Sequence, residues 1–144
     1  MSYLTAHRAL QTAITAAWLV GAPLVSGGPA SPVLLYDNLD APADTPALPY
    51  GILRIANVDS AQYTLGEVGG RLFSRAGVVG VEIRVPAGTG RELVDGLAQV
   101  IVDALEGATI DSVRIRHPRL QEIGGDAHLF RVDVVADFEY EILR

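Results

Sequence analysis

The C-terminal part of this 144-residue chain alternates apolar and polar side chains from residue 130 to residue 142, with Val135 as the single apolar residue at a polar position. Successive side chains of a strand point to opposite faces, so this pattern predicts one long strand over 128–143 with a single apolar face. An isolated strand cannot bury such a face. The chain must therefore build a sheet and cover one side of it with a second layer.

Two amphipathic helices are predicted to form that layer. The first spans residues 3–21, after Ser2, and the second follows Thr89 and ends before Gly107. Each carries apolar side chains at spacings of three and four, which indicates one buried stripe. Ser2 is a suitable N-cap, and Thr89 with Glu92 three residues later predicts a capping box at the start of the second helix.

The remaining strands are predicted from shorter β-type runs. Residues 52–58 and 71–85 are predicted to pair as a β-hairpin with a long hairpin loop at 59–75. A further strand covers 113–116. The segment 118–127, which begins with a proline and contains two glycines, is predicted to connect that strand to the last one.

Together these elements predict an α+β fold in a single domain over residues 1–144. The predicted order is α-β-β-β-α-β-β. It describes a mixed, mostly antiparallel sheet with the two amphipathic helices packed on one face. The first β element is the apolar run 33–36, which is predicted to be an edge strand. It lies within 21–49, a segment rich in Gly, Pro, Ser and Ala that we expect to form an extended surface arm.

Composition limits the classes of function. Hydrophobic residues make up 49% and charged residues 19% of the chain, which is too apolar for a disordered protein. The sequence has no cysteine, so disulfides, thiolate metal sites and Cys nucleophiles are excluded. A net charge of −6 argues against a dedicated nucleic-acid binder. The apolar run 16–25 is too short to cross a bilayer, and we expect neither a membrane segment nor a signal peptide.

The sequence contains no clear catalytic or cofactor motif. His7, His117 and His128 have no second His or carboxylate at a metal-ligand spacing, so we expect surface histidines and no metal. The glycines at 66–70 precede a strand and do not match a nucleotide-binding pattern. Those at 88–91 open a helix and could receive an anion, but without a Lys they more simply form a turn. We therefore expect no enzyme and no cofactor.

One chemically suggestive feature is an acidic row on the polar face of the last predicted strand. The row consists of Asp133, Asp137, Glu139 and Glu141. Cross-strand pairing with Arg84, Arg114 and Arg116 explains it most simply. A second interpretation is a role in assembly, with the row facing a central channel and repelling DNA phosphates. A metal site or catalytic carboxylates are disfavoured, because no His or Asn accompanies the row on its strand.

Five segments carry a resemblance to a known family. They are residues 49–54, 69–77, 81–90 (which contains the turn Pro-Ala-Gly-Thr-Gly), 113–116 and 130–140. In the order and spacing of these segments, the chain resembles the small tail-terminator (tail-completion) proteins of long-tailed phages, prophages and gene transfer agents. The resemblance extends over nearly the whole chain.

This resemblance implies a structural protein of a virion or phage-like particle, assembled in the bacterial cytoplasm and located at the head-proximal end of the tail. Such proteins form a homo-oligomeric ring of about six copies, which caps the tail tube and stops its polymerisation. The implied partners are the tail tube protein and the head–tail connector or adaptor. DNA passes through the ring without specific binding, and the resemblance implies no catalytic residue and no cofactor.

The hairpin is the candidate contact surface for a neighbouring subunit or the tube, because it mixes apolar and arginine side chains. The candidate residues are Leu65, Arg71, Phe73 and Arg75. An ordinary flexible hairpin is the alternative for this segment. Two other functions remain open: a head–tail adaptor, which the sheet-rich pattern disfavours, and a small-molecule-binding α+β domain, for which the sequence names no convergent polar groups.

Overall fold

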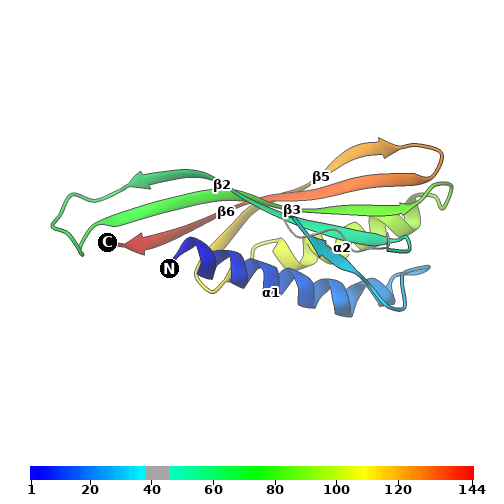
Figure 1. Cartoon of the computed structure of the whole chain (residues 1–144), viewed down its shortest axis with the longest axis horizontal. Helices are drawn as coiled ribbons and strands as arrows, with labels where there is room; N and C mark the ends of the chain where they lie inside the picture. The colour runs from blue at the N-terminus through cyan, green and yellow to red at the C-terminus, as the bar shows by residue number, and fades with distance from the viewer. Residues whose placement is uncertain (38–45) are drawn as a thin grey trace.

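The computed structural model describes residues 1–37 and 46–144. These residues form one six-stranded sheet with two helices on one face (Figure 1). In chain order the elements are α1 (Tyr3–Gly21), the short 3₁₀ helix η1 (Ala22–Leu24), β1 (Leu34–Tyr36), β2 (Tyr50–Gln62), β3 (Leu72–Pro86), α2 (Arg91–Leu105), β4 (Thr109–Ile110), β5 (Val113–Gly125) and β6 (Leu129–Leu143). The predicted α+β class, both helices and the element order are confirmed, and the two-residue β4 is an addition.

The sheet is antiparallel except at one edge. Its order is β1-β2-β3-β6-β5-β4, and β1 is the strand that runs parallel to its neighbour, β2. The predicted edge strand at 33–36 is thus confirmed as β1. Residues 38–45 of the predicted arm lie outside the described residues. β3 and β6 form the centre of the sheet and pair along their full length, from Leu72 opposite Leu143 to Pro86 opposite Leu129.

The hydrophobic core lies between the helices and one face of the sheet. Every second side chain of β6 from Val132 to Ile142 is buried there, as the alternation predicts. Burying a large aliphatic or aromatic side chain contributes about 1.5–3 kcal/mol, so this interface is the main source of stability. Gly77 in β3 makes room for the Phe138 ring, because a Cβ at Gly77 would lie 2.5 Å from that ring.

Side-chain hydrogen bonds hold α1 near both of its ends. The Ser2 hydroxyl accepts the backbone N–H of Thr5 at 3.1 Å, which confirms the predicted N-cap. Near the other end, Trp18 is fully buried and its indole N–H donates to the carbonyl of Val33 at 3.1 Å. This bond ties the residue that precedes β1 to the helical layer.

The predicted capping box of α2 is wrong. Gly90, not Thr89, is the N-cap, and the Thr89 hydroxyl donates to the carbonyl of Pro86 at 2.8 Å. The reason is the sharp turn from β3 into α2. It requires positive φ values of 82° at Gly88 and 75° at Gly90, which glycine tolerates. The turn leaves the Thr89 side chain bonded to the preceding strand.

The two hairpins have longer strands than predicted. β2 continues to Gln62 and β3 begins at Leu72, so their loop covers 63–71 rather than 59–75. β5 continues through Pro118 to Gly125, so most of the predicted connection at 118–127 is strand. The register of β5 against β6 shifts between 116 and 119 and again between 122 and 124. These β-bulges allow the strand to continue past the proline.

The molecule is elongated along its strands. The β2–β3 hairpin projects past the start of α1, at the end of the sheet where the C-terminus also lies, and the β5–β6 turn lies at the opposite end (Figure 1). The helices cover one face of the sheet. We call the other face the open face; it carries the even-numbered residues of β3 and the odd-numbered residues of β6.

Candidate functional site

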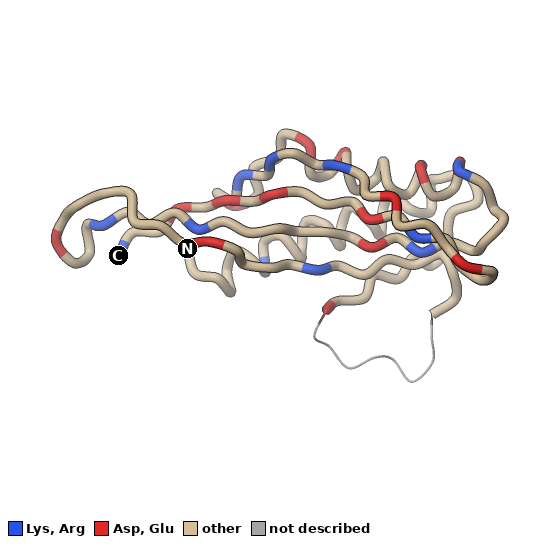
Figure 2. The backbone as a smooth tube through the Cα atoms, turned by 90° about the horizontal axis from the view of Figure 1, so that it is seen from above, with Lys and Arg blue, Asp and Glu red and all other residues tan. Residues whose placement is uncertain are grey.

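The open face is the candidate functional surface, because charged side chains from neighbouring strands meet on it. Figure 2 shows acidic and basic positions alternating across the long strands. The register places Arg114 of β5 opposite Glu139 of β6, and Arg116 opposite Asp137. All four predicted members of the acidic row lie on this face.

Arginines on the neighbouring strand or within β6 pair with the acidic row. Arg116 lies 2.6 Å and Arg114 lies 3.3 Å from the carboxylate of Glu139. The other pairs are Arg114 with Glu141 at 3.2 Å, Arg119 with Asp137 at 3.5 Å and Arg131 with Asp133 at 3.0 Å. Exposed pairs of this kind each contribute less than about 1 kcal/mol. Their main effect is that positive and negative charges balance on the open face. That the acidic row faces a central channel stays a prediction.

A buried carboxylate lies on the open face, in the central strand β3. Glu82 of β3 is 2% exposed, and its oxygens lie 3.3 Å from Arg54, 3.2 Å from Arg84 and 2.6 Å from Arg131. The three arginines come from β2, β3 and β6 and cover the carboxylate. A hydrogen bond to Asp133 raises the pKa of Arg131, although partial burial opposes this effect. We call these four residues, Glu82 with its arginines, the Glu82 cluster.

The four predicted interface residues do not share one surface. Leu65 is 97% exposed at the tip of the β2–β3 hairpin. Arg71 lies at the base of the loop, where its Nε donates to a loop carbonyl at 2.8 Å, and Phe73 is half-buried. Arg75 is 8% exposed, and its guanidinium lies 3.9 Å from the centre of the Tyr3 ring. Arg75 therefore packs within its own chain, and Leu65 is the member most open to a partner.

The hairpin tip exposes further apolar side chains that the sequence analysis did not single out. Tyr63 is 59% exposed and Val68 is 87% exposed, both in the loop that carries Leu65. Three exposed apolar side chains in a nine-residue projecting loop form a small apolar surface, of the kind that marks a contact with another protein.

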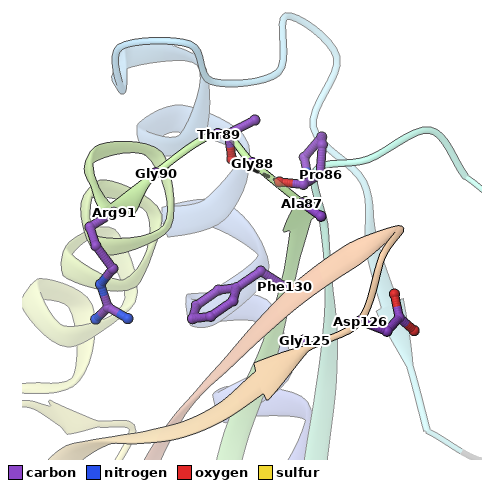
Figure 3. Close-up of a pocket in the computed structure, with 9 residues that line it drawn as sticks. All are labelled: Pro86, Ala87, Gly88, Thr89, Gly90, Arg91, Gly125, Asp126 and Phe130. Carbon is purple, nitrogen blue, oxygen red and sulfur yellow. Dashed lines mark hydrogen bonds between the residues drawn. The ribbon is translucent and has the colours of Figure 1, made fainter.

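A cavity of about 480 Å³ lies where β3 turns into α2 (Figure 3). It is lined by residues 86–91 and by Gly125, Asp126 and Phe130 of the β5–β6 hairpin. Most of this lining is backbone and small side chains. Two charged side chains belong to it, those of Arg91 and Asp126.

Both charged groups of this cavity already have partners. Arg91 pairs with Asp95 at 2.9 Å and with Glu122, and its guanidinium lies 5.6 Å from the centre of the Phe130 ring. The Asp126 carboxylate accepts the backbone N–H groups of His128 at 2.7 Å and of the next residue at 3.0 Å, which lowers the pKa of Asp126. The cavity therefore shows no charged group awaiting a ligand.

A second hollow, of about 340 Å³, lies on the open face beside the acidic row. Its polar side chains are Arg116, His117, Asp137 and Glu139. Among residues 1–37 and 46–144, no three His, Asp or Glu side chains are grouped so that they could hold a metal ion. In the same two stretches, no helix is both long and apolar enough to cross a bilayer.

The outer edges of the long strands are a further feature of the surface. β1 pairs with β2 at residues 51–53, and β4 pairs with β5 at residues 113–114. In the described part of the chain, no strand pairs with the outer edge of β2 over 55–62 or of β5 over 116–125. Three large apolar side chains on these segments are exposed: Val58, Leu120 and Ile123, at 69%, 50% and 53%.

Comparison with known proteins addresses the fold. No family model and no curated protein matches the sequence. Among solved structures, 24 chains match. One of them, a protein whose name states no function, matches with a TM-score of 0.61 and 14% sequence identity, and the match covers 96% of this chain and 97% of the other. At this level of identity the likeness shows a shared fold over nearly the full length of both chains.

Proposed function

We propose that this chain is a tail terminator. It assembles into a ring, caps the tail tube of a phage or phage-like particle, stops tube polymerisation and joins the tube to the head-side connector. The observation that carries the proposal is the form of the subunit: one sheet covered on one face, a projecting hairpin, and edge segments of β2 (55–62) and β5 (116–125) that no strand covers among residues 1–37 and 46–144. A closed ring needs a different contact surface on each side of every copy. The five segments that resemble the tail-terminator family support the assignment of this ring to the end of a tail tube.

The charge balance of the open face supports a position along the DNA channel. A collar through which DNA passes must not retain the duplex, and unpaired arginines would bind its phosphates. The basic residues of this face are Arg54, Arg84, Arg114, Arg116, Arg119 and Arg131, and the acidic ones are Asp59, Glu82, Asp133, Asp137, Glu139 and Glu141. Because the two sets match in number, a channel lined by this face neither attracts nor strongly repels DNA.

Ring formation is the first test. Mass measurement in solution and negative-stain electron micrographs are made of the protein alone and mixed with tubes of the tail tube protein from the same genome. The expected result is a closed ring of about six copies, free or on tube ends, and tubes that stop growing once capped. Isolated particles in both samples would overturn the proposal. Binding to the connector but not the tube would favour a head–tail adaptor, and a compact monomer with a ligand in the cavity of Figure 3 would favour a binding domain.

The acidic row gives a second test, of the channel position. Replacing Asp137, Glu139 and Glu141 by the corresponding amides leaves their arginine partners without counter-charge. Rings should still form, bind duplex DNA at least about tenfold more tightly at low salt, and impair DNA delivery. The control variant Asp103→Asn/Glu106→Gln removes negative charge from exposed positions at the end of α2. Unchanged DNA binding and normal delivery by the row variant would overturn the channel position.

A further inference from the structure

We propose that copies of this chain join edge to edge. The outer edge of β2 (55–62) in one copy pairs with the outer edge of β5 (116–125) in the next, so that the sheets continue into one closed barrel wall. This inference rests on the ring of the proposed function and identifies the surfaces that close it. It follows from strand direction, stagger, edge chemistry and side-chain complementarity.

Strand direction makes the joint antiparallel. β2, β3, β6 and β5 lie side by side in that order, and each runs antiparallel to the next. The two outer strands, β2 and β5, therefore run in opposite directions. A rotation about a ring axis carries one copy onto the next without reversing it. The same rotation keeps every open face on one side of the wall, so β2 meets the neighbouring β5 as an ordinary antiparallel partner.

The stagger of the two uncovered edges fits a barrel. Asp59 on β2 lies level with Arg114 on β5 of the same copy, through the pairs with Ala76 and Glu139. Arg119 lies level with Arg54, through Val135 and Gly80, and Gly80 is four ladder positions from Ala76, the partner of Asp59. Placing Asp59 beside Arg119 of the next copy shifts each copy by about 13 Å along the strands across a width of about 19 Å. The resulting slope is about 35°, at the lower limit of the 35–45° at which strands tilt in closed barrels.

The outer edge of β2 is less protected against pairing than that of β5. Natural edges are protected by charged side chains, by proline, by β-bulges or by a covering segment. The β5 edge carries Arg116, Pro118, Arg119 and two bulges, whereas the β2 edge has one bulge, between Asn57 and Asp59.

Residues 55–62 contain no proline, and Asp59 is their one charged residue. Tyr63 donates its N–H to Leu72 on β3, so by alternation the N–H of Ser60 points away from β3. Within the described chain, that N–H donates to the neighbouring carboxylate of Asp59 at 2.8 Å, so a new strand can replace a purely local contact.

The side chains of the two edges are complementary. Asp59 and Arg119 both lie on the open face, and the ion pair of Arg119 with Asp137, at 3.5 Å, is the longest on that face. An acidic residue on one edge thus meets a basic residue on the other. Val58 borders the hollow on the open face, whereas Leu120 lies opposite the buried Val134 and so on the helix-covered face. These two exposed apolar side chains therefore flank the joint on opposite faces of the sheet.

Engineered disulfides test the joint, because the natural chain has no cysteine. The double variant Asp59→Cys/Arg119→Cys places both thiols on the open face. It cannot cross-link within one copy, since β3 and β6 hold the two edges about 14 Å apart. Oxidation should therefore give a ladder of covalent multimers that ends at the ring. The matched pair Asp59→Cys/Asp103→Cys should give no ladder. Cross-linked dimers of Asp59→Cys alone, at the yield of the double variant, would overturn the proposal in favour of β2 pairing with itself.

Ser60→Pro tests the backbone contact. It removes an outward N–H and no hydrogen bond of the β2–β3 ladder, so the subunit should fold while rings require at least about tenfold more protein to form. Ser60→Ala is the control and should assemble normally. Asp59→Arg should weaken assembly in the same way, and Asp59→Arg/Arg119→Asp should restore it. Normal rings from Ser60→Pro, or no rescue by the exchanged pair, would overturn the edge pairing.

The outcomes separate this inference from the proposed function. Rings that cap tubes without any edge cross-link would refute the joint and leave the tail terminator standing. Edge-linked rings that ignore tail tubes would support the joint and refute the tail terminator. A protein that forms no cross-link at any concentration, with or without tubes, would overturn the joint.

Discussion

At the scale of single residues, Glu82 is the side chain on which the open face depends most. A buried carboxylate costs several kcal/mol to desolvate unless cations compensate it. The arginines of the Glu82 cluster do so from three strands, and the cluster therefore favours the observed register of β2, β3 and β6. This cluster could not be predicted from the sequence. Arg84 was predicted to pair with the acidic row, whereas it pairs with Glu82, and the burial of Glu82 depends on a register that the sequence does not reveal.

Glu82→Gln is expected to lower the free energy of unfolding by about 2–3 kcal/mol, because it leaves three guanidinium groups without their shared counter-charge. The partial exposure of the arginines keeps this below the full cost for a buried ion pair. Glu139→Gln, which also removes a carboxylate paired with two arginines, should cost less than about 1 kcal/mol. Denaturant unfolding of both variants measures the difference, and equal losses would contradict the burial argument.

Asp126 gives a pH prediction. Two backbone N–H groups in the β5–β6 turn lower its pKa. The folded-state pKa lies below the unfolded one, so the carboxylate stabilises the fold above the ordinary Asp pKa of about 4, and this contribution is lost as the pH falls through the folded pKa. Asp126→Asn should therefore lower the Tm at pH 7 and approach the parent Tm in more acidic solution. Thermal melts across this range test it. A Tm difference that grows on acidification would have the wrong sign, and Asp103→Asn controls for general charge effects.

At the scale of elements, the turn from β3 into α2 is held by backbone geometry. Gly90 has φ 75° and ψ −171°, a region that is essentially restricted to glycine. No atom lies within 4 Å of a Cβ added at Gly90, so backbone strain alone sets the cost of Gly90→Ala, about 1–3 kcal/mol. Thr89→Ala should cost less than about 0.5 kcal/mol, because Thr89 does not cap the helix. Chemical denaturation measures both, and the reverse order of losses would restore the capping-box interpretation.

Elements with a sustained hydrophobic period were predictable from the sequence. α1, α2 and β6 each repeat one pattern over more than a dozen residues, and all three were found where predicted. β5 was predicted too short, because Pro118 and two later glycines are ordinary turn signals. β5 continues past the proline and reaches the glycines through two β-bulges, because the long strand β6 pairs with it over this whole stretch. Pairing between strands decided that outcome, and such pairing is not visible in a local pattern.

The candidate site was predictable only in part, for the same reason. The acidic row follows from the alternation of one strand, and its place on the face opposite the helices was predictable. The predicted interface residues failed to form a group because Arg75 packs against Tyr3, seventy-two positions earlier in the chain. The uncovered edges of β2 and β5 had no sequence signal, since they depend on which strands end up outermost.

At the scale of the whole molecule, the projecting hairpin separates folding from assembly. Its loop contributes no residue to the core cluster. Replacing residues 64–71 with a two-residue Asn-Gly turn should therefore change the Tm by no more than a few degrees. It removes Leu65 and Val68 and keeps Tyr63, so capping of tail tubes should be lost if the tip meets the tube. Leu65→Ser is the conservative companion variant. Thermal melts measure the stability of both variants, and tube-growth assays measure their capping. Full capping by both variants would show that the hairpin tip does not contact the tube.

In the proposed ring, every subunit offers one strand edge to each of its two neighbours, so the last copy added differs from all earlier ones. A copy that extends an open arc gains one joint and exposes a new edge, whereas the final copy gains two joints for a single loss of translational freedom. Incomplete arcs should therefore be scarce, and free chains should exist beside finished circles. A subunit with one blocked edge prevents closure of any ring that it joins. A small fraction of such subunits, mixed with normal ones, should therefore reduce the number of closed rings by more than that fraction.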